Sequence, residues 1–134
     1  MDRKRIPVMV RQGAGFVILA ALLLGGLLSG WLLHRQHDDL SRQLEDAAWW
    51  AMSGNWEQAR DTAVAVRTQW RKHWNIQAAF TDHTPMEEID SLFAQLAICA
   101  ASGDREQFAA VCVDLAQHIR AVGDAHRLTW WNLL

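Results

Sequence analysis

Residues 13–33 read GAGFVILAALLLGGLLSGWLL and contain no charged side chain. A helix of this length would extend about 31 Å, close to the ~30 Å hydrocarbon core of a bilayer. Inside lipid the backbone amides find no water, so a helix that pairs them internally is the structure such a segment adopts. The stretch therefore predicts a transmembrane helix, with residues 1–12 on one side and residues 34–134 on the other.

A cleaved signal peptide is the alternative explanation for this segment. The apolar region of a signal peptide usually has about 7–15 residues, and the run here is longer. The tripeptide Leu28-Ser29-Gly30 lacks an A-x-A cleavage pattern and precedes more apolar residues, and no cysteine directly follows the run to accept a lipid. We expect an uncleaved anchor.

Charge is distributed unevenly around the anchor. Residues 1–33 carry four basic side chains and one acidic side chain, a net charge of +3, whereas residues 34–134 carry nine Lys or Arg and fourteen Asp or Glu, a net charge of −5. Basic residues beside a first membrane helix hold that end in the cytoplasm, which predicts an extracytoplasmic module. Nucleic acid is not expected as a partner, because binding its phosphates requires an excess of Lys and Arg.

Small residues within the anchor form a G-x-x-x-G pattern at Gly26 and Gly30. This spacing lets a second helix approach closely, so another membrane protein or a second copy of the chain in a homodimer is a candidate partner. Glycine is also common in membrane helices without any such role. Both interpretations stay open.

The rest of the chain predicts helices only, because its apolar residues recur at three-to-four spacing and no window alternates long enough to form a strand. The expected fold is all-α, with the transmembrane helix continuing into a small antiparallel bundle of about four helices, arranged as two helical hairpins. The expected bundle helices cover residues 38–53, 56–80, 85–102 and 105–122.

Glycines and capping residues set these boundaries. Gly54, Gly103 and Gly123 are expected to end helices, since glycine adopts the left-handed conformation that follows a helix end. Asn55 with Gln58, and Asp104 with Gln107, have the spacing of capping boxes.

Eight tryptophans stand out in a chain that has no tyrosine. Their spacing favours the core of the bundle for Trp49, Trp56, Trp70 and Trp74. A groove that stacks on a sugar or a peptide is the alternative.

Three other tryptophans are candidates for an interaction surface. Trp50 is less easily buried than Trp49, because adjacent helix residues point about 100° apart. Trp130 and Trp131 belong to the apolar tail LTWWNLL, which we expect to fold back onto the bundle, with docking on a partner or on the membrane as alternatives.

Polar side chains around residue 84 suggest a ligand site. Asp82, His83, Glu87 and Asp90 could supply oxygen and nitrogen ligands to a metal, although Thr84-Pro85 interrupts the helix and the acidic residues also suit its first turn. We favour the helix-capping role and expect no metal. His34 and His37 are expected on a solvated face near the membrane.

Catalytic motifs are absent from the sequence. Cys99 and Cys112 occupy apolar positions of two neighbouring predicted helices and are expected to be buried thiols, with a disulfide as the alternative. No Ser-His-Asp order, Gly-rich phosphate loop, CxxC or HExxH occurs. The sequence therefore predicts a protein that is not an enzyme and needs no cofactor.

Several short motifs resemble a known family. They are Trp70-x3-Trp74, Phe80-Thr81-Asp82-His83, Glu88-Ile89-Asp90 and the ending Asn132-Leu133-Leu134. Together they are similar to a family of small bacterial single-pass membrane proteins with a Trp-rich helical domain, catalogued as a domain of unknown function. The resemblance implies the same architecture and a bacterial cell envelope location, and implies no activity.

The functional hypothesis is a membrane-anchored interaction or accessory module that serves another membrane component. The alternative is a sensor that binds a small molecule or a metal between the second and third bundle helices, near Trp70, Trp74, His83 and Asp90.

Overall fold

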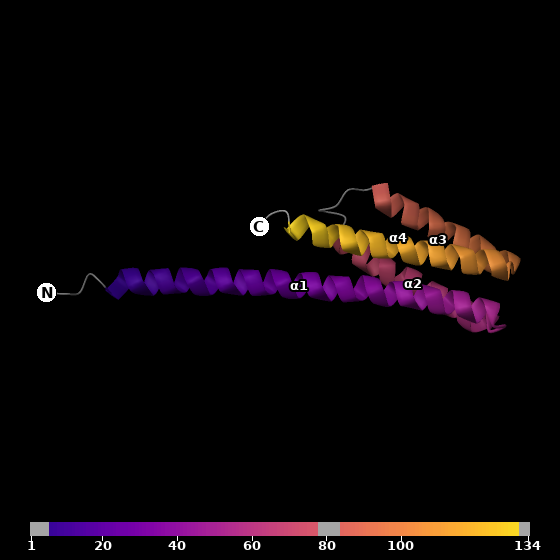
Figure 1. The fold of residues 1–134 in the computed structure, drawn as a ribbon, viewed down its shortest axis with the longest axis horizontal. Helices are drawn as coiled ribbons and strands as arrows, with labels where there is room; N and C mark the ends of the chain where they lie inside the picture. Colours follow the sequence, from indigo (N-terminus) through magenta and orange to yellow (C-terminus); the bar gives the residue numbers. More distant parts are fainter. Residues whose placement is uncertain (1–5, 78–83, 132–134) are drawn as a thin grey trace. The chain divides into compact units, whose positions relative to one another are not determined.

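The structure is a computed structural model that describes the backbone of residues 6–77 and 84–131 and the side chains of residues 13–32, 35–72 and 86–125. All regular structure in the described backbone is α-helical. The four helices are α1 (Ile6–Met52), α2 (Trp56–Gln77), α3 (Thr84–Ser102) and α4 (Arg105–Trp131), shown in Figure 1. The all-α prediction is confirmed.

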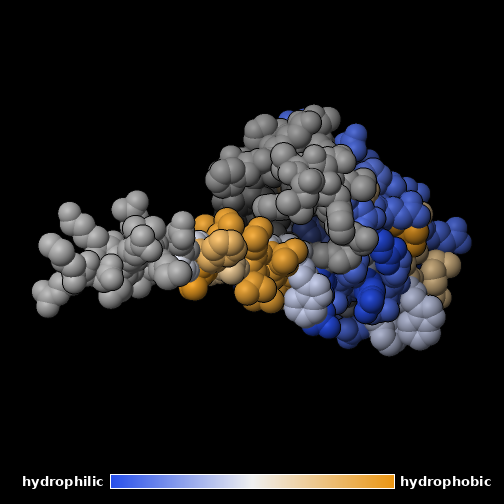
Figure 2. Space-filling model, turned by 60° about the vertical axis from the view of Figure 1, so that its left-hand side comes forward, coloured by the Kyte–Doolittle hydropathy of each residue, from blue (hydrophilic) through white to orange (hydrophobic). Residues whose placement is uncertain are grey.

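By its internal contacts the chain divides into residues 1–33 and residues 34–134. In the first unit, eleven large apolar side chains between Phe16 and Leu32 are each 49–77% exposed, and Figure 2 shows a hydrophobic band there. The Ser29 hydroxyl donates a 2.7 Å hydrogen bond to the Gly25 carbonyl, so this polar group is satisfied within the helix. Among the described residues, this one helix is long and apolar enough to cross a membrane.

Apolar side chains from all four helices form one core in the second unit. Their three-to-four spacing in the sequence places them on one face of each helix. The consecutive helices α3 and α4 lie side by side (Figure 1). The largest fully buried apolar side chains are Leu44 from α1, Val66 from α2, Ile89 from α3, and Phe108, Leu115 and Ile119 from α4.

Two short turns connect the helices at the predicted glycines. Gly54 and Gly103 have φ of +95° and +75°, a conformation that costs other residues roughly 1–2 kcal/mol. The Asn55 amide donates to the Trp50 carbonyl at 2.9 Å, and the Gly103 amide donates to the Cys99 carbonyl at 3.0 Å. Both turns thus satisfy carbonyls that a helix end leaves without partners.

The two predicted capping boxes have different outcomes. The Asp104 carboxylate accepts a 3.0 Å hydrogen bond from the Gln107 amide, as expected for an N-cap. At the start of α2, the Gln58 side-chain amide instead lies 3.5 Å from the Thr62 hydroxyl.

Gly123 does not end a helix, which corrects the prediction. Helix α4 continues through it to Trp131, and its φ is not positive. A Cβ atom built at Gly123 would lie 3.2 Å from the His37 Cβ. Glycine is therefore used here to let α4 approach α1 closely, a role that a single sequence does not distinguish from a helix stop.

Candidate functional site

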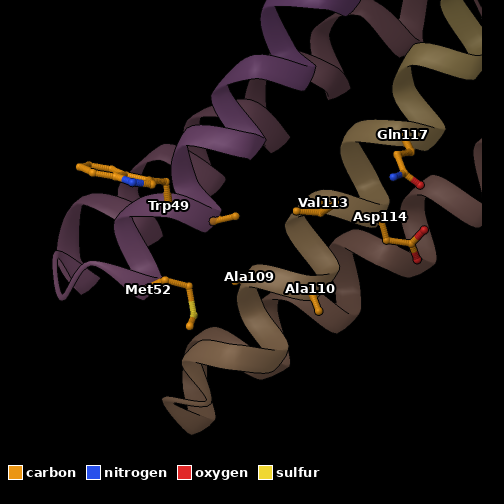
Figure 3. A pocket seen from close by; sticks show the side chains of 8 residues that line it. Trp49, Met52, Ala109, Ala110, Val113, Asp114 and Gln117 are labelled. Atoms are coloured by element: carbon orange, nitrogen blue, oxygen red, sulfur yellow. The ribbon is translucent and has the colours of Figure 1, made fainter.

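An open apolar groove runs between α1 and α4 within the unit of residues 34–134 (Figure 3). Trp49 and Met52 of α1 lie on one side, each 61% exposed, and Val113 of α4 lies on the other, 42% exposed. The complete lining, which we call the α1/α4 groove, is Ala48, Trp49, Met52, Ala109, Ala110, Val113, Asp114 and Gln117.

Small side chains create this groove. Ala48 and Ala109 are buried where the two helices meet, and because alanine ends at Cβ, nothing larger fills the space above them. The Trp49 ring packs edge-on against Trp50, with 4.6 Å between the ring centroids and 71° between the planes, a favourable aromatic geometry. The Trp49 indole thus packs against its own helix and points away from α4 (Figure 3), with most of its surface exposed.

Polar contacts join α1 to α4 beside the groove. The buried Ser41 hydroxyl lies 2.9 Å from the His37 carbonyl and 3.0 Å from the Ala116 carbonyl. The Arg120 guanidinium donates a 2.7 Å hydrogen bond to the Glu45 carboxylate, and this bond lowers the pKa of Glu45. The bonds of Ser41 to Ala116 and of Arg120 to Glu45 thus link the two helices next to the groove.

The structure reverses the predicted burial of Trp49 and Trp50. Trp50 is only partly exposed and packs against the core, whereas Trp49 is largely exposed. At about 100° per residue, Trp50 lies beside the buried face formed by Leu44, Ala47 and Ala51, whereas Trp49 lies almost opposite that face, which was the available signal. Met52 borders the groove, while the Trp49 indole points away from α4 in Figure 3.

The other tryptophans follow their predictions where the structure describes them. Trp70 is buried, and Trp56 is partly buried and packs edge-on against Phe108, with 4.9 Å between centroids. The side chains of Trp74, Trp130 and Trp131 lie outside the described side chains. The predicted roles of Trp130 and Trp131 therefore stay predictions.

Gly26 and Gly30 lie in the apolar helix of the first unit, and a Cβ atom at either position would meet nothing within 4 Å. The surface around both glycines is open within this chain. A helix–helix contact at this pair stays a prediction.

The predicted polar cluster is only partly described. Asp82 and His83 lie outside the described residues, while Glu87 and Asp90 are exposed on α3. Within the described part of the chain, no group of three His, Cys, Asp or Glu side chains is arranged to hold a metal ion.

His118 of α4 has acidic neighbours that the sequence analysis did not bring together. Its Nε2 lies 3.8 Å from a Glu88 oxygen of α3, and its Nδ1 lies 3.3 Å from an Asp114 oxygen. Nδ1 is also 2.9 Å from the Asp114 carbonyl. Since His118 and Asp114 are four residues apart on α4, their contact follows from helical spacing, whereas the contact to Glu88 required the packing of α3 on α4.

His37 is buried, which corrects the expectation of a solvated face. It is 6% exposed, and its ring meets the buried Trp70 ring edge-on with 6.0 Å between the centroids. Trp70 Nε1 has no hydrogen-bond partner among the described residues. The periodicity of α1 places His37 seven residues before Leu44, on the same face, which was the available signal.

Cys99 and Cys112 are both buried free thiols, as predicted. Burial, with a smaller contribution from Cys99, raises the pKa of the Cys112 thiol to about 12. A thiol with such a pKa is protonated near neutral pH and is a weak nucleophile.

Comparison with known proteins identifies one family. A family model described as a domain of unknown function, DUF4363, matches residues 29–133, a range that includes every residue of the α1/α4 groove. No curated protein matches the chain, and no solved structure matches it.

Proposed function

The chain belongs to the DUF4363 family, and on that premise we propose that it is a single-pass membrane protein whose helical module docks another protein of the same membrane through the α1/α4 groove. Its role is that of an interaction or accessory subunit, without catalysis and without a cofactor. The observation that carries the proposal is the exposed apolar pair of Met52 on α1 and Val113 on α4, which faces the groove beside buried alanines.

Membrane anchoring is supported by the first unit. Eleven exposed large apolar side chains lie between Phe16 and Leu32, and each would gain roughly 1.5–3 kcal/mol on leaving water. The basic residues before the span favour a cytoplasmic N-terminus. The proposed topology therefore places residues 1–12 in the cytoplasm, the span in a bacterial cell membrane, and residues 34–134 outside.

Docking through the groove is supported by the kind of side chains that it exposes. Methionine is enriched where proteins contact one another, and Met52 is the large exposed side chain of α1 that faces the groove. A tethered module also meets partners that are confined to the same membrane, which raises their effective concentration.

The docking proposal is tested by site-specific photocrosslinking in native membranes. A photoreactive residue at position 52 is compared with one at position 98, since Ile98 is 67% exposed and does not line the groove. We expect position 52 alone to give a discrete crosslinked species, which disappears on Val113→Glu. Equal labelling from both positions, or none from position 52, contradicts docking through the groove.

The proposed topology is tested separately. Protease added to intact spheroplasts should digest residues 34–134 and spare an N-terminal epitope tag. Recovery of the intact chain in the soluble fraction contradicts the anchor, and protection of residues 34–134 contradicts the orientation.

The sensor hypothesis stays a prediction. Its proposed ligand site lies between α2 and α3, where His83 and the side chain of Trp74 are outside the description. The exposed apolar side chains of the described residues give stronger support to a site in the groove between α1 and α4 than to one between α2 and α3.

A further inference from the structure

We propose that the occupant of the α1/α4 groove is an amphipathic helix of the partner protein, with an apolar stripe bordered by Lys and Arg side chains. This inference rests on the proposed function and specifies the chemistry of the partner. Three features of the groove carry it: its shape, its apolar lining and the sign of the charges beside it.

The shape of the groove suits a helix. It is bounded by two helices, and a third helix laid along such a groove makes the side-by-side packing found in helical bundles. From Ala109 to Gln117 the α4 side of the lining extends about 12 Å, which corresponds to a little over two turns of a docked helix. The alanine floor leaves room for large apolar side chains that point inward at i, i+3, i+4 and i+7.

The charge beside the groove is mainly negative. On α4, Glu106, Ala110, Val113 and Gln117 are spaced at intervals of four, three and four residues, so they share one helix face. Both Glu106 and the groove-lining Asp114 are exposed. The α4 edge of the groove therefore presents two carboxylates to an occupant.

Basic side chains do not neutralise this edge in the described part of α4. The Arg105 guanidinium lies 5.8 Å from the centre of the Trp56 ring, and the Arg120 guanidinium is bonded to Glu45. On α1, Arg42 is exposed and places one positive charge near Glu45. The module as a whole carries a net charge of −5 by its sequence, from nine basic and fourteen acidic side chains.

Charge also argues against a second copy as the occupant. A two-fold contact through the groove would bring the same carboxylates of both copies, Glu106 and Asp114, into one interface. Like charges placed together in an interface disfavour that pairing, whereas Lys and Arg beside an apolar stripe would be attracted to this edge.

The experiment measures binding of defined fluorescent peptides to the full-length chain in nanodiscs of phosphatidylcholine, with empty nanodiscs as the blank. The first peptide has leucines at i, i+3, i+4 and i+7 and lysines at most other positions, over about 18 residues or five turns. The matched control peptide replaces every lysine with glutamate and keeps the leucines. Fluorescence anisotropy at low and high salt gives the affinities.

We expect the lysine peptide to bind, and the glutamate peptide to bind at least about tenfold more weakly. Met52→Ala should weaken binding of the lysine peptide by roughly 10-fold, the loss expected of a well-placed interface residue. The double change Glu106→Gln with Asp114→Asn should weaken it about 3- to 10-fold, consistent with two exposed charges, and this effect should fade at high salt. Ile98→Ala and Val64→Ala, at exposed positions outside the groove, should change the affinity less than about twofold.

Equal binding of the two peptides overturns the proposed chemistry, and so does a Met52→Ala variant that binds like Ile98→Ala. Met52-dependent dimerisation of the chain, seen as crosslinks at twice its mass, assigns the groove to a second copy and also overturns it. If photocrosslinking from position 52 succeeds while the lysine peptide fails, docking stands and only the basic helix is rejected. If photocrosslinking fails too, the proposed function falls with it.

Discussion

Replacing Gly123 with valine is expected to destabilise the helical module, because α4 passes so close to α1 at this point. A Cβ atom at Gly123 would lie 3.2 Å from the His37 Cβ and 3.4 Å from its Cγ, whereas carbon atoms in favourable contact are about 3.5–4.0 Å apart. Valine adds two methyl groups beyond that Cβ. Overpacking of this kind typically costs about 1–3 kcal/mol.

The variant Gly123→Ala is subject to two opposing effects on stability. Alanine stabilises a helix by about 1 kcal/mol relative to glycine, and the short contact of its Cβ with His37 offsets part or all of that gain. We therefore expect Gly123→Ala to lie within about 1 kcal/mol of the wild type. Had Gly123 ended the helix in a left-handed conformation, alanine would instead cost about 1–2 kcal/mol.

The assay is thermal unfolding of the full-length chain in detergent micelles, followed by far-ultraviolet circular dichroism. A change of 1 kcal/mol shifts the Tm of a module this size by about 4–8 °C, so Gly123→Val should lower the Tm by at least about 4 °C. Removing the imidazole with His37→Ala should reduce the effect of Gly123→Val, which a double-mutant cycle measures. The reasoning is refuted if Gly123→Val melts like the wild type, or if Gly123→Ala is as harmful as Gly103→Ala.

Four further outcomes follow from the geometry. Gly103→Ala should destabilise the module by about 1–2 kcal/mol, and Gly103→Asn by less, in the same thermal assay; equal losses would contradict a left-handed turn. Trp70→Ala should lower the free energy of unfolding by about 3–5 kcal/mol. Trp70→Phe should lower it much less, because phenylalanine keeps a large ring and removes an indole N–H that lacks a partner among the described residues. Similar losses from the two variants would show that the N–H does not matter. The hydrogen bond from Arg120 lowers the pKa of Glu45. The stability that this bond adds is therefore present above the unfolded-state pKa of Glu45 and is lost as the pH falls through its folded-state pKa. The Tm difference between the wild type and Glu45→Gln, worth less than about 1 kcal/mol for an exposed pair, should close in acid; a difference that widens in acid would contradict this. Cys112, with its pKa raised to about 12, should not react with iodoacetamide at mildly alkaline pH until the protein is denatured. Mass spectrometry of a Cys99→Ala variant measures this reaction at Cys112 alone. Rapid labelling of the folded chain would contradict the burial of Cys112.

The candidate surface could be predicted only in part, because it depends on which side of a helix its neighbours cover. Leu44, Ala47 and Ala51 define the buried face of α1 from periodicity alone. At about 100° per residue, Trp50 then falls beside that face and Trp49 almost opposite it, so the exposure of Trp49 follows from the sequence. The side of this face on which α4 packs, and hence the groove at Ala48 and Met52, required the tertiary structure.

The sequence by itself determined the features that depend on neighbouring residues along the chain. These are the uncharged apolar run, the helical periods, and the turns at Gly54 and Gly103, because backbone hydrogen bonds and φ preferences act over a few residues. Only the tertiary structure decided the features that depend on a second helix: the close approach of α4 to α1 at Gly123, the contact of His118 with Glu88, and the groove between α1 and α4. Each of these depends on which helices lie next to one another, and one helical pattern fits several such arrangements equally well.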